Sequence, residues 1–179
     1  MTITKLDVAE REIVAAVRLL FNGGDPVAVY VLASAARAIT TALCEHRGVR
    51  SFLDDARQSH PHLSKKDIYN LANRHAGFLK HADRDPDAVL YDFDDGEADA
   101  VLYVAVSDFW RLYGGIPIEA RAFAIWFDAH VDPAGHGKEA AEVLVGIETM
   151  SRPQQLELGK VFVAWARTQP DLHMPYSTK

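Results

Sequence analysis

Arginine and histidine lie close together in the segment NRHAGFLKHADRD (residues 73–85), which contains Arg74, His75 and His81. An imidazole can accept and donate protons near neutral pH, and a guanidinium can grip a phosphate or carboxylate through two parallel hydrogen bonds. These side chains have the chemistry for proton transfer on an anionic substrate. They can equally be the polar side of a buried helix, and the sequence leaves both interpretations open.

Helical periodicity places these residues on one predicted helix over residues 65–82. Ser64 and Asp67 resemble a capping box at its start, and Pro86 disfavours helix just before it. At about 100° per residue, His75 falls near the middle of the apolar stripe of this helix. The position predicts a core histidine with one hydrogen-bond partner.

The outer face of the same helix is predicted to make contacts. Arg74 and His81 are seven residues apart, so an unbroken helix would place them almost above each other, two turns apart. Asn73, Gly77 and Lys80 share or border this face, and the absence of a side chain at Gly77 would let a backbone or ligand approach closely. We expect a second subunit or a substrate there, with a merely solvated face as the alternative.

The whole chain is predicted to be all-α: a bundle of five to six core helices that opens with an antiparallel hairpin, plus a C-terminal helical extension. The predicted helices cover residues 6–20, 26–47, 52–57, 65–82, 97–113, 117–131, 138–147 and 153–168. A loop-like interval at 132–137 separates a bundle at 1–131 from C-terminal helices at 132–179. We expect the two parts to pack together as one domain.

Composition narrows the class of protein. With 19 basic and 25 acidic side chains, the net charge is −6, which argues against a generally basic surface for nucleic acid or anionic membrane. Cys44 is the only cysteine, so no intramolecular disulfide can form. Neither a signal peptide nor an apolar run near the roughly 20 residues of a membrane span is evident. We therefore expect a cytoplasmic protein that does not associate with membranes.

The run Arg74-His75-Ala76-Gly77-Phe78-Leu79-Lys80-His81 resembles the signature of the HEPN domains. These are all-helical proteins whose motif is an arginine, a polar residue, a few arbitrary residues and a histidine. The opening hairpin, with its GD turn and alanine-rich second helix, is also similar to the start of that fold. The resemblance covers residues 6–113 at the level of pattern.

The HEPN resemblance implies metal-independent cleavage of RNA at a homodimer interface. His81 would then be the acid and base for the ribose 2′-hydroxyl, and Arg74 would clamp the phosphate. His75 would orient one of these two residues, while Asn73 and Lys80 would contact backbone phosphates. A toxin of this type would require a neutralising partner protein.

A second resemblance and the acidic residues after His81 favour a function other than RNA cleavage. The segment FLKHADRDPDA resembles a stretch of small bacterial helical proteins of uncharacterised function, which implies no activity. Asp83, Asp85 and Asp87 follow His81 closely, and their carboxylates would repel RNA. The leading hypothesis is therefore an interaction or regulatory module that works as a homodimer, with the endoribonuclease as the alternative.

A metal-binding bundle is the second alternative. Histidines six residues apart do not share a helix face well, so His75 and His81 would not form a site by themselves. Ligands would have to come from other helices, and the candidates are His46, His60, His62 and His130. The sequence shows no motif for an organic cofactor, and we predict neither a cofactor nor a bound metal.

Overall fold

The structure is a computed structural model that describes residues 2–81, 83–131 and 143–169, and within these residues it is helical without a strand. The helices are α1 (Lys5–Phe21), α2 (Pro26–Arg47), α3 (Phe52–Ser59), α4 (Lys65–Ala72), α5 (Ala76–Lys80), α6 (Asp95–Tyr113), α7 (Ile118–Val131) and α9 (Arg152–Ala166), with a 3-10 turn η1 (Ile147–Thr149). The all-α prediction is confirmed. The first half of the helix predicted at 138–147 lies outside the described residues, and the 3-10 turn η1 begins at its last residue, Ile147.

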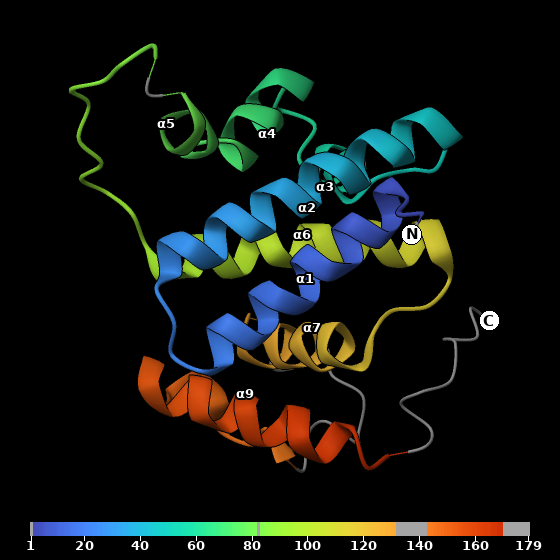
Figure 1. Cartoon of the computed structure of the whole chain (residues 1–179), viewed down its shortest axis with the longest axis vertical. Coiled ribbons are helices and arrows are strands. Elements are labelled where there is room, and N and C mark those ends of the chain that lie inside the picture. The colour runs from blue at the N-terminus through green and yellow to red at the C-terminus, as the bar shows by residue number, and fades with distance from the viewer. Residues whose placement is uncertain (1, 82, 132–142, 170–179) are drawn as a thin grey trace.

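Helices α1 and α2 form the predicted antiparallel hairpin (Figure 1). The Asp25 carboxylate accepts hydrogen bonds from the Val27 N–H at 2.8 Å and the Ala28 N–H at 3.2 Å, which caps α2 at its predicted start. Gly48 ends α2 in the left-handed conformation at φ 65°, where glycine carries no steric penalty. Both boundaries of α2 therefore follow from local chemistry.

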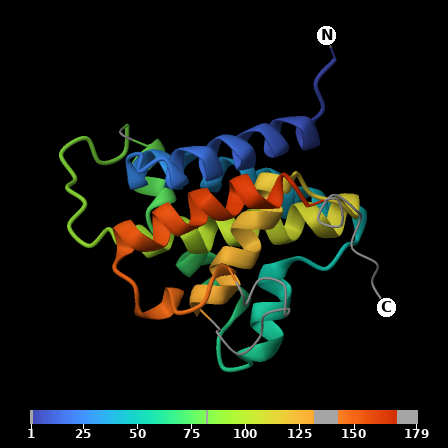
Figure 2. The same ribbon diagram turned by 90° about the horizontal axis from the view of Figure 1, so that it is seen from below.

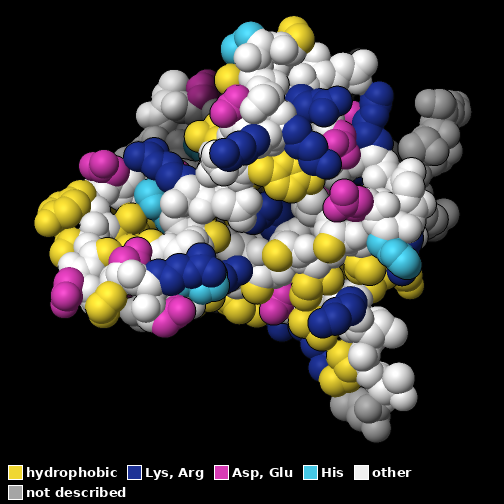
Figure 3. Space-filling view, turned by 90° about the horizontal axis from the view of Figure 1, so that it is seen from above, with side chains coloured by type: hydrophobic (Ala, Val, Ile, Leu, Met, Phe, Trp, Pro, Cys, Tyr) yellow, Lys and Arg dark blue, Asp and Glu magenta, His cyan; other side chains and the backbone are white. Residues whose placement is uncertain are grey.

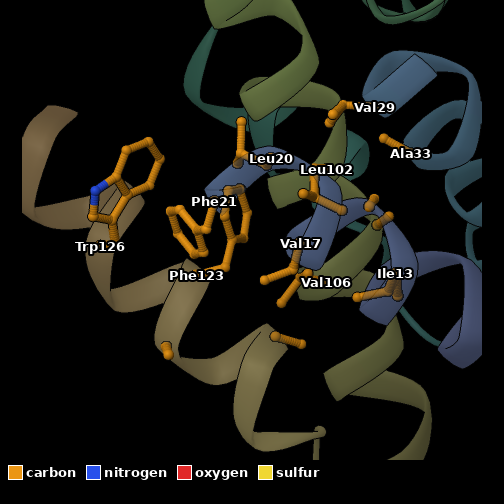
Figure 4. Close-up of a cluster of buried hydrophobic side chains, with 14 of the residues drawn as sticks. Ile13, Val17, Leu20, Phe21, Val29, Ala33, Leu102, Val106, Phe123 and Trp126 are labelled. Atoms are coloured by element: carbon orange, nitrogen blue, oxygen red, sulfur yellow. The ribbon is translucent and has the colours of Figure 1, made fainter. Parts of the chain in front are cut away.

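The main core lies where α2 packs on α6 and where α1 and α7 close over them (Figure 4). Ala33 and Ala36 of α2 are fully buried, and their small side chains allow α6 to approach closely. At the other end of the core, the rings of Phe21 and Trp126 meet edge to face, with centroids 5.1 Å apart. This core fixes α6, the helix against which the candidate site is built.

Helix α2 is long and apolar enough to cross a membrane by length and composition alone, which the sequence analysis did not anticipate. Half of its apolar stretch is buried inside the fold, where it lies between α1 and α6. It also carries Arg37 in a buried position. These features are those of the central helix of a folded domain.

Helix α9 packs across α7 and α1 on the side of the bundle opposite α4 and α5 (Figures 1 and 2). The Arg152 guanidinium donates two hydrogen bonds, of 2.6 and 2.9 Å, to the fully buried Asp99 carboxylate of α6. The Trp126 indole N–H donates to the Gln155 carbonyl at 2.9 Å. The C-terminal helix is thus tied to the core by buried polar contacts as well as by apolar packing.

Glu119 of α7 joins three helices. Its Oε1 accepts hydrogen bonds from Arg18 of α1 at 2.8 Å and from Arg167, just after α9, at 2.9 Å. Burial alone would raise the pKa of Glu119, but the hydrogen bonds from the two guanidinium groups outweigh it and lower the pKa to about 2. Because the pKa is below its unfolded value of 4.5, this carboxylate stabilises the fold above pH 4.5 and loses that contribution as the pH falls toward 2.

We predict that Glu119→Gln lowers the free energy of unfolding at pH 7 by about 1–2 kcal/mol, because both arginines are partly exposed and screened by water. The difference from the wild type should shrink as the pH falls from 4.5 toward 2, as measured by denaturant unfolding at a series of pH values. The control is Glu157→Gln, which alters an exposed glutamate of α9. A Glu119→Gln deficit that stays constant down to pH 3 would contradict the analysis.

Candidate functional site

The predicted helix over 65–82 is wrong as one continuous element. The Ser64–Asp67 capping box is present and starts α4, with the Asp67 N–H donating to Ser64 Oγ at 3.2 Å. However, α4 ends at Ala72 and α5 begins only at Ala76. The predicted end near residue 82 lies outside the described residues.

A buried guanidinium explains the break. Arg37 of α2 is only 4% exposed, and its Nη2 donates to Asn73 Oδ1 at 2.5 Å. The Asn73 Nδ2 in turn donates to the Tyr69 carbonyl of α4 at 2.7 Å. Burial lowers the pKa of Arg37, and among the described residues its Nε has no hydrogen-bond partner. A guanidinium removed from water needs acceptors, and the end of α4 supplies one.

Sequence reasoning missed Arg37 and assigned Asn73 a different role. Asn73 was expected to contact substrate phosphates, whereas here its side chain joins α4 to α2. The signal that could have revealed Arg37 is a charged residue in an apolar, alanine-rich helix, because such a residue requires a polar partner from a neighbouring element.

Arg74 and His75 both approach Glu97 in the first turns of α6. The Arg74 Nη1 donates to Glu97 Oε1 at 3.3 Å, and the His75 Nε2 lies 2.6 Å from Glu97 Oε2. The short histidine contact does not have hydrogen-bond geometry, so it is best described as an electrostatic contact. One carboxylate therefore offsets the charge of the predicted phosphate clamp.

His75 is buried, as its position on the apolar stripe predicted. Its ring meets Tyr30 at 6.0 Å and Phe93 at 5.6 Å between centroids, both edge to face. Its backbone N–H donates to the Tyr30 hydroxyl at 3.4 Å. Through these contacts, His75 packs the turn between α4 and α5 against α2 and the start of α6.

His81 and Lys80 lie beyond the turn, at the end of α5. His81 follows the last residue of α5, and its Nδ1 is 4.0 Å from Asp83 Oδ1. Lys80 is exposed and acts electrostatically on Glu12 of α1. Arg74 lies in the turn between α4 and α5, whereas His81 follows α5, so the two do not lie two turns apart on one continuous helix as expected.

An apolar groove opens between α3, α4 and α6, with a cavity volume of about 380 Å³. Its walls include side chains from all three helices: Phe52, Leu53, Ala56, Ile68, Leu71, Ala72, Val101 and Val104. Arg74 and Glu97 also line the groove. On α6 the groove lining runs from Glu97 to Val104, so the Arg74–Glu97 ion pair lies at one end of the groove. An apolar cavity with a few polar groups at its edge is typical of a binding site.

The groove exists because α3 and α4 contact α6 through a small apolar cluster of their own. Leu53, Ile68 and Val104 form this cluster, separate from the main core. The contact leaves Leu71 of α4 uncovered, with 68% of its surface exposed. On the surrounding face, Lys and Arg side chains gather around apolar ones, with several carboxylates among them (Figure 3).

Metal binding and catalysis by a cysteine nucleophile receive no support from the described residues. Among them, no group of three or more His, Cys, Asp or Glu side chains could hold a metal ion. Cys44 is buried, and burial together with the nearby Asp108 charge raises the pKa of its thiol to about 12. A thiol with that pKa stays protonated at neutral pH and is a poor nucleophile.

Because Glu97 engages Arg74, and Arg74 and His81 lie on different elements, we predict no cleavage of single-stranded RNA by the purified protein in the presence of a chelator. The measurement compares the wild type with His81→Ala under identical conditions. Equal cleavage by both proteins would indicate a contaminating nuclease. Cleavage by the wild type that His81→Ala abolishes would contradict this interpretation of the site.

Comparison with known proteins adds no further constraint: a scan against protein-family models, a search of curated proteins and a search of solved structures each found no match for the chain.

Proposed function

We propose that this protein is a non-catalytic interaction or regulatory module of HEPN-like helical type, which works as a homodimer in the bacterial cytoplasm. The observation that carries the proposal is the apolar groove between α3, α4 and α6, with Leu71 exposed at its edge. Its occupant is a protein surface, supplied by a second copy of the chain.

Exposed apolar surface favours association. Burying a leucine side chain contributes about 1.5–3 kcal/mol, and a contiguous apolar groove with charged residues around it is typical of a protein-binding face. Tyr91 and Val89, which follow α5, add further exposed apolar surface. Together with the groove, they give the molecule both a concave and a protruding apolar feature.

The arrangement of the candidate catalytic residues supports a module over a ribonuclease. Arg74 is paired with Glu97, His75 is buried against aromatic rings, and His81 lies near Asp83. A phosphate clamp and a general base would need to face a common substrate. The proposal therefore includes neither RNA as a substrate nor the neutralising partner that a toxin would require.

We predict that the wild type sediments as a dimer and that Leu71→Asp raises the dimer dissociation constant at least about tenfold, because a buried apolar contact is replaced by a charge. Sedimentation equilibrium measures this constant, and circular dichroism checks that the variant stays folded. The matched control is Val161→Asp, which alters a residue of α9 that is 51% exposed on another face. A monomeric wild type, or Leu71→Asp with an unchanged constant, would refute the proposal.

A further inference from the structure

Residues 83–92 form an acidic loop between α5 and α6 that carries apolar side chains into solvent. Tyr91 is 83% exposed and Val89 is 60% exposed. Both views of the ribbon show this loop standing away from the helices (Figures 1 and 2). Exposed aromatic and branched side chains on a protruding loop are typical of a segment that becomes buried against a partner.

Both ends of the acidic loop are attached to the fold. After it, the Phe93 ring packs edge to face on Tyr30 and on His75, with centroids 5.6 Å apart in each case. At its start, the Arg84 N–H of the loop donates to the carbonyl of His81, the residue that follows α5, at 2.9 Å, which closes a local turn. Attachment at both ends reduces the conformational entropy that the loop would lose on binding.

The charge of the acidic loop is strongly negative. Asp83, Asp85, Asp87 and Asp92 are offset only by Arg84. All five of these residues are exposed to solvent. The loop therefore presents an apolar centre flanked by carboxylates, and its complement is an apolar groove flanked by basic side chains.

Such a complement lies next to the apolar groove. A polar cavity of about 770 Å³ shares Leu63 with the groove, and its lining includes Arg50, Arg57 and Lys65. Asp54 also lines it, but that carboxylate accepts a 2.8 Å hydrogen bond from Ser51 within the cap of α3.

Two of the cations in this cavity are available to a partner. Among the described residues, Arg57 makes no ion pair within 4.0 Å, and Lys65 makes only a long one of 3.9 Å to Glu45. Both cations act electrostatically on Asp54, and the Lys65 ammonium also lies 5.4 Å from the centre of the Tyr69 ring. Arg50, by contrast, is engaged by Asp55 at 3.1 Å. Arg57 and Lys65 are therefore the side chains best placed to pair with carboxylates from a partner.

We propose that the acidic loop of one copy docks into the groove of a second copy, and that the exchange is reciprocal. Val89 and Tyr91 enter the apolar groove, while Asp85 and Asp87 pair with Arg57 and Lys65. This inference rests on the homodimer of the proposed function and adds the surfaces that form it. Within one chain the loop is exposed and the groove is open, so a twofold dimer that uses both contacts twice satisfies both features.

The test uses two charge-reversed forms of the full chain, one with Arg57→Glu and Lys65→Glu and one with Asp85→Lys and Asp87→Lys. Each form alone juxtaposes like charges in both contacts, so its dimer dissociation constant should rise at least about tenfold. An equimolar mixture restores opposite charges in both contacts of the heterodimer. Its constant should return to within about threefold of the wild-type value, as measured by sedimentation equilibrium at low salt.

A third variant, Val89→Ser with Tyr91→Ser, tests the apolar part and should also weaken the dimer at least about tenfold. Val161→Ser on α9 is its control and should not. A wild-type dimer that the loop variants leave unchanged, or charge-reversed forms that fail to associate when mixed, would overturn the loop–groove contact while leaving the homodimer intact. A wild type that stays monomeric would overturn the proposed function itself.

Discussion

The buried guanidinium of Arg37 is the constraint on which the candidate site depends. It lies in the central helix α2 with almost no access to water, and Asn73 is the acceptor that the structure provides. Because an unpaired buried charge is costly, this hydrogen bond favours ending α4 at that point. The chain then turns, and the turn directs Arg74 and His75 toward Glu97. A cationic residue inside the core thus determines where Arg74 and His75 lie.

The same region explains why an apolar groove remains open. Helix α3 is held by Asp108 of α6, whose Oδ1 accepts from the Phe52 N–H at 2.6 Å and whose Oδ2 accepts from Thr41 Oγ1 at 2.8 Å. Burial raises the pKa of Asp108, while these hydrogen bonds oppose that effect. Polar contacts at Asp108 and Asn73 fix the two ends of the α3–α4 layer. Only a small apolar cluster joins its middle to α6, so the layer covers α6 incompletely.

Much of the fold could be predicted from local sequence. The bounds of α2 follow from Asp25, Pro26 and Gly48, whose effects on the helix ends do not depend on distant residues. The burial of His75 followed from its place on the apolar stripe. By contrast, the apolar stripe of residues 68–82 continues through the break, so periodicity alone could not locate it. The break reflects a contact with Arg37, which is 36 residues away in sequence.

The groove could not be predicted for a similar reason. Leu71 has the spacing of a core residue, and its exposure depends on how far α4 extends over α6. The sequence predicted that the acidic residues after His81 would repel RNA. It did not predict that Arg57 of α3 and Lys65 of α4 line one cavity and could pair with those acidic residues, because this requires the relative placement of the two helices. The helices could thus be predicted from local sequence, whereas the surfaces formed between helices could be identified only from the tertiary structure.

The most direct test of this account is the effect of Asn73→Ala on the free energy of unfolding, measured by urea denaturation beside Asn70→Ala in the last turn of α4. Alanine is the better helix former, so a continuous helix would be stabilised by both changes. If Arg37 instead depends on the Asn73 amide, Asn73→Ala should cost about 1–3 kcal/mol, while Asn70→Ala should be neutral or slightly stabilising. Equal or greater stability in Asn73→Ala would contradict the account.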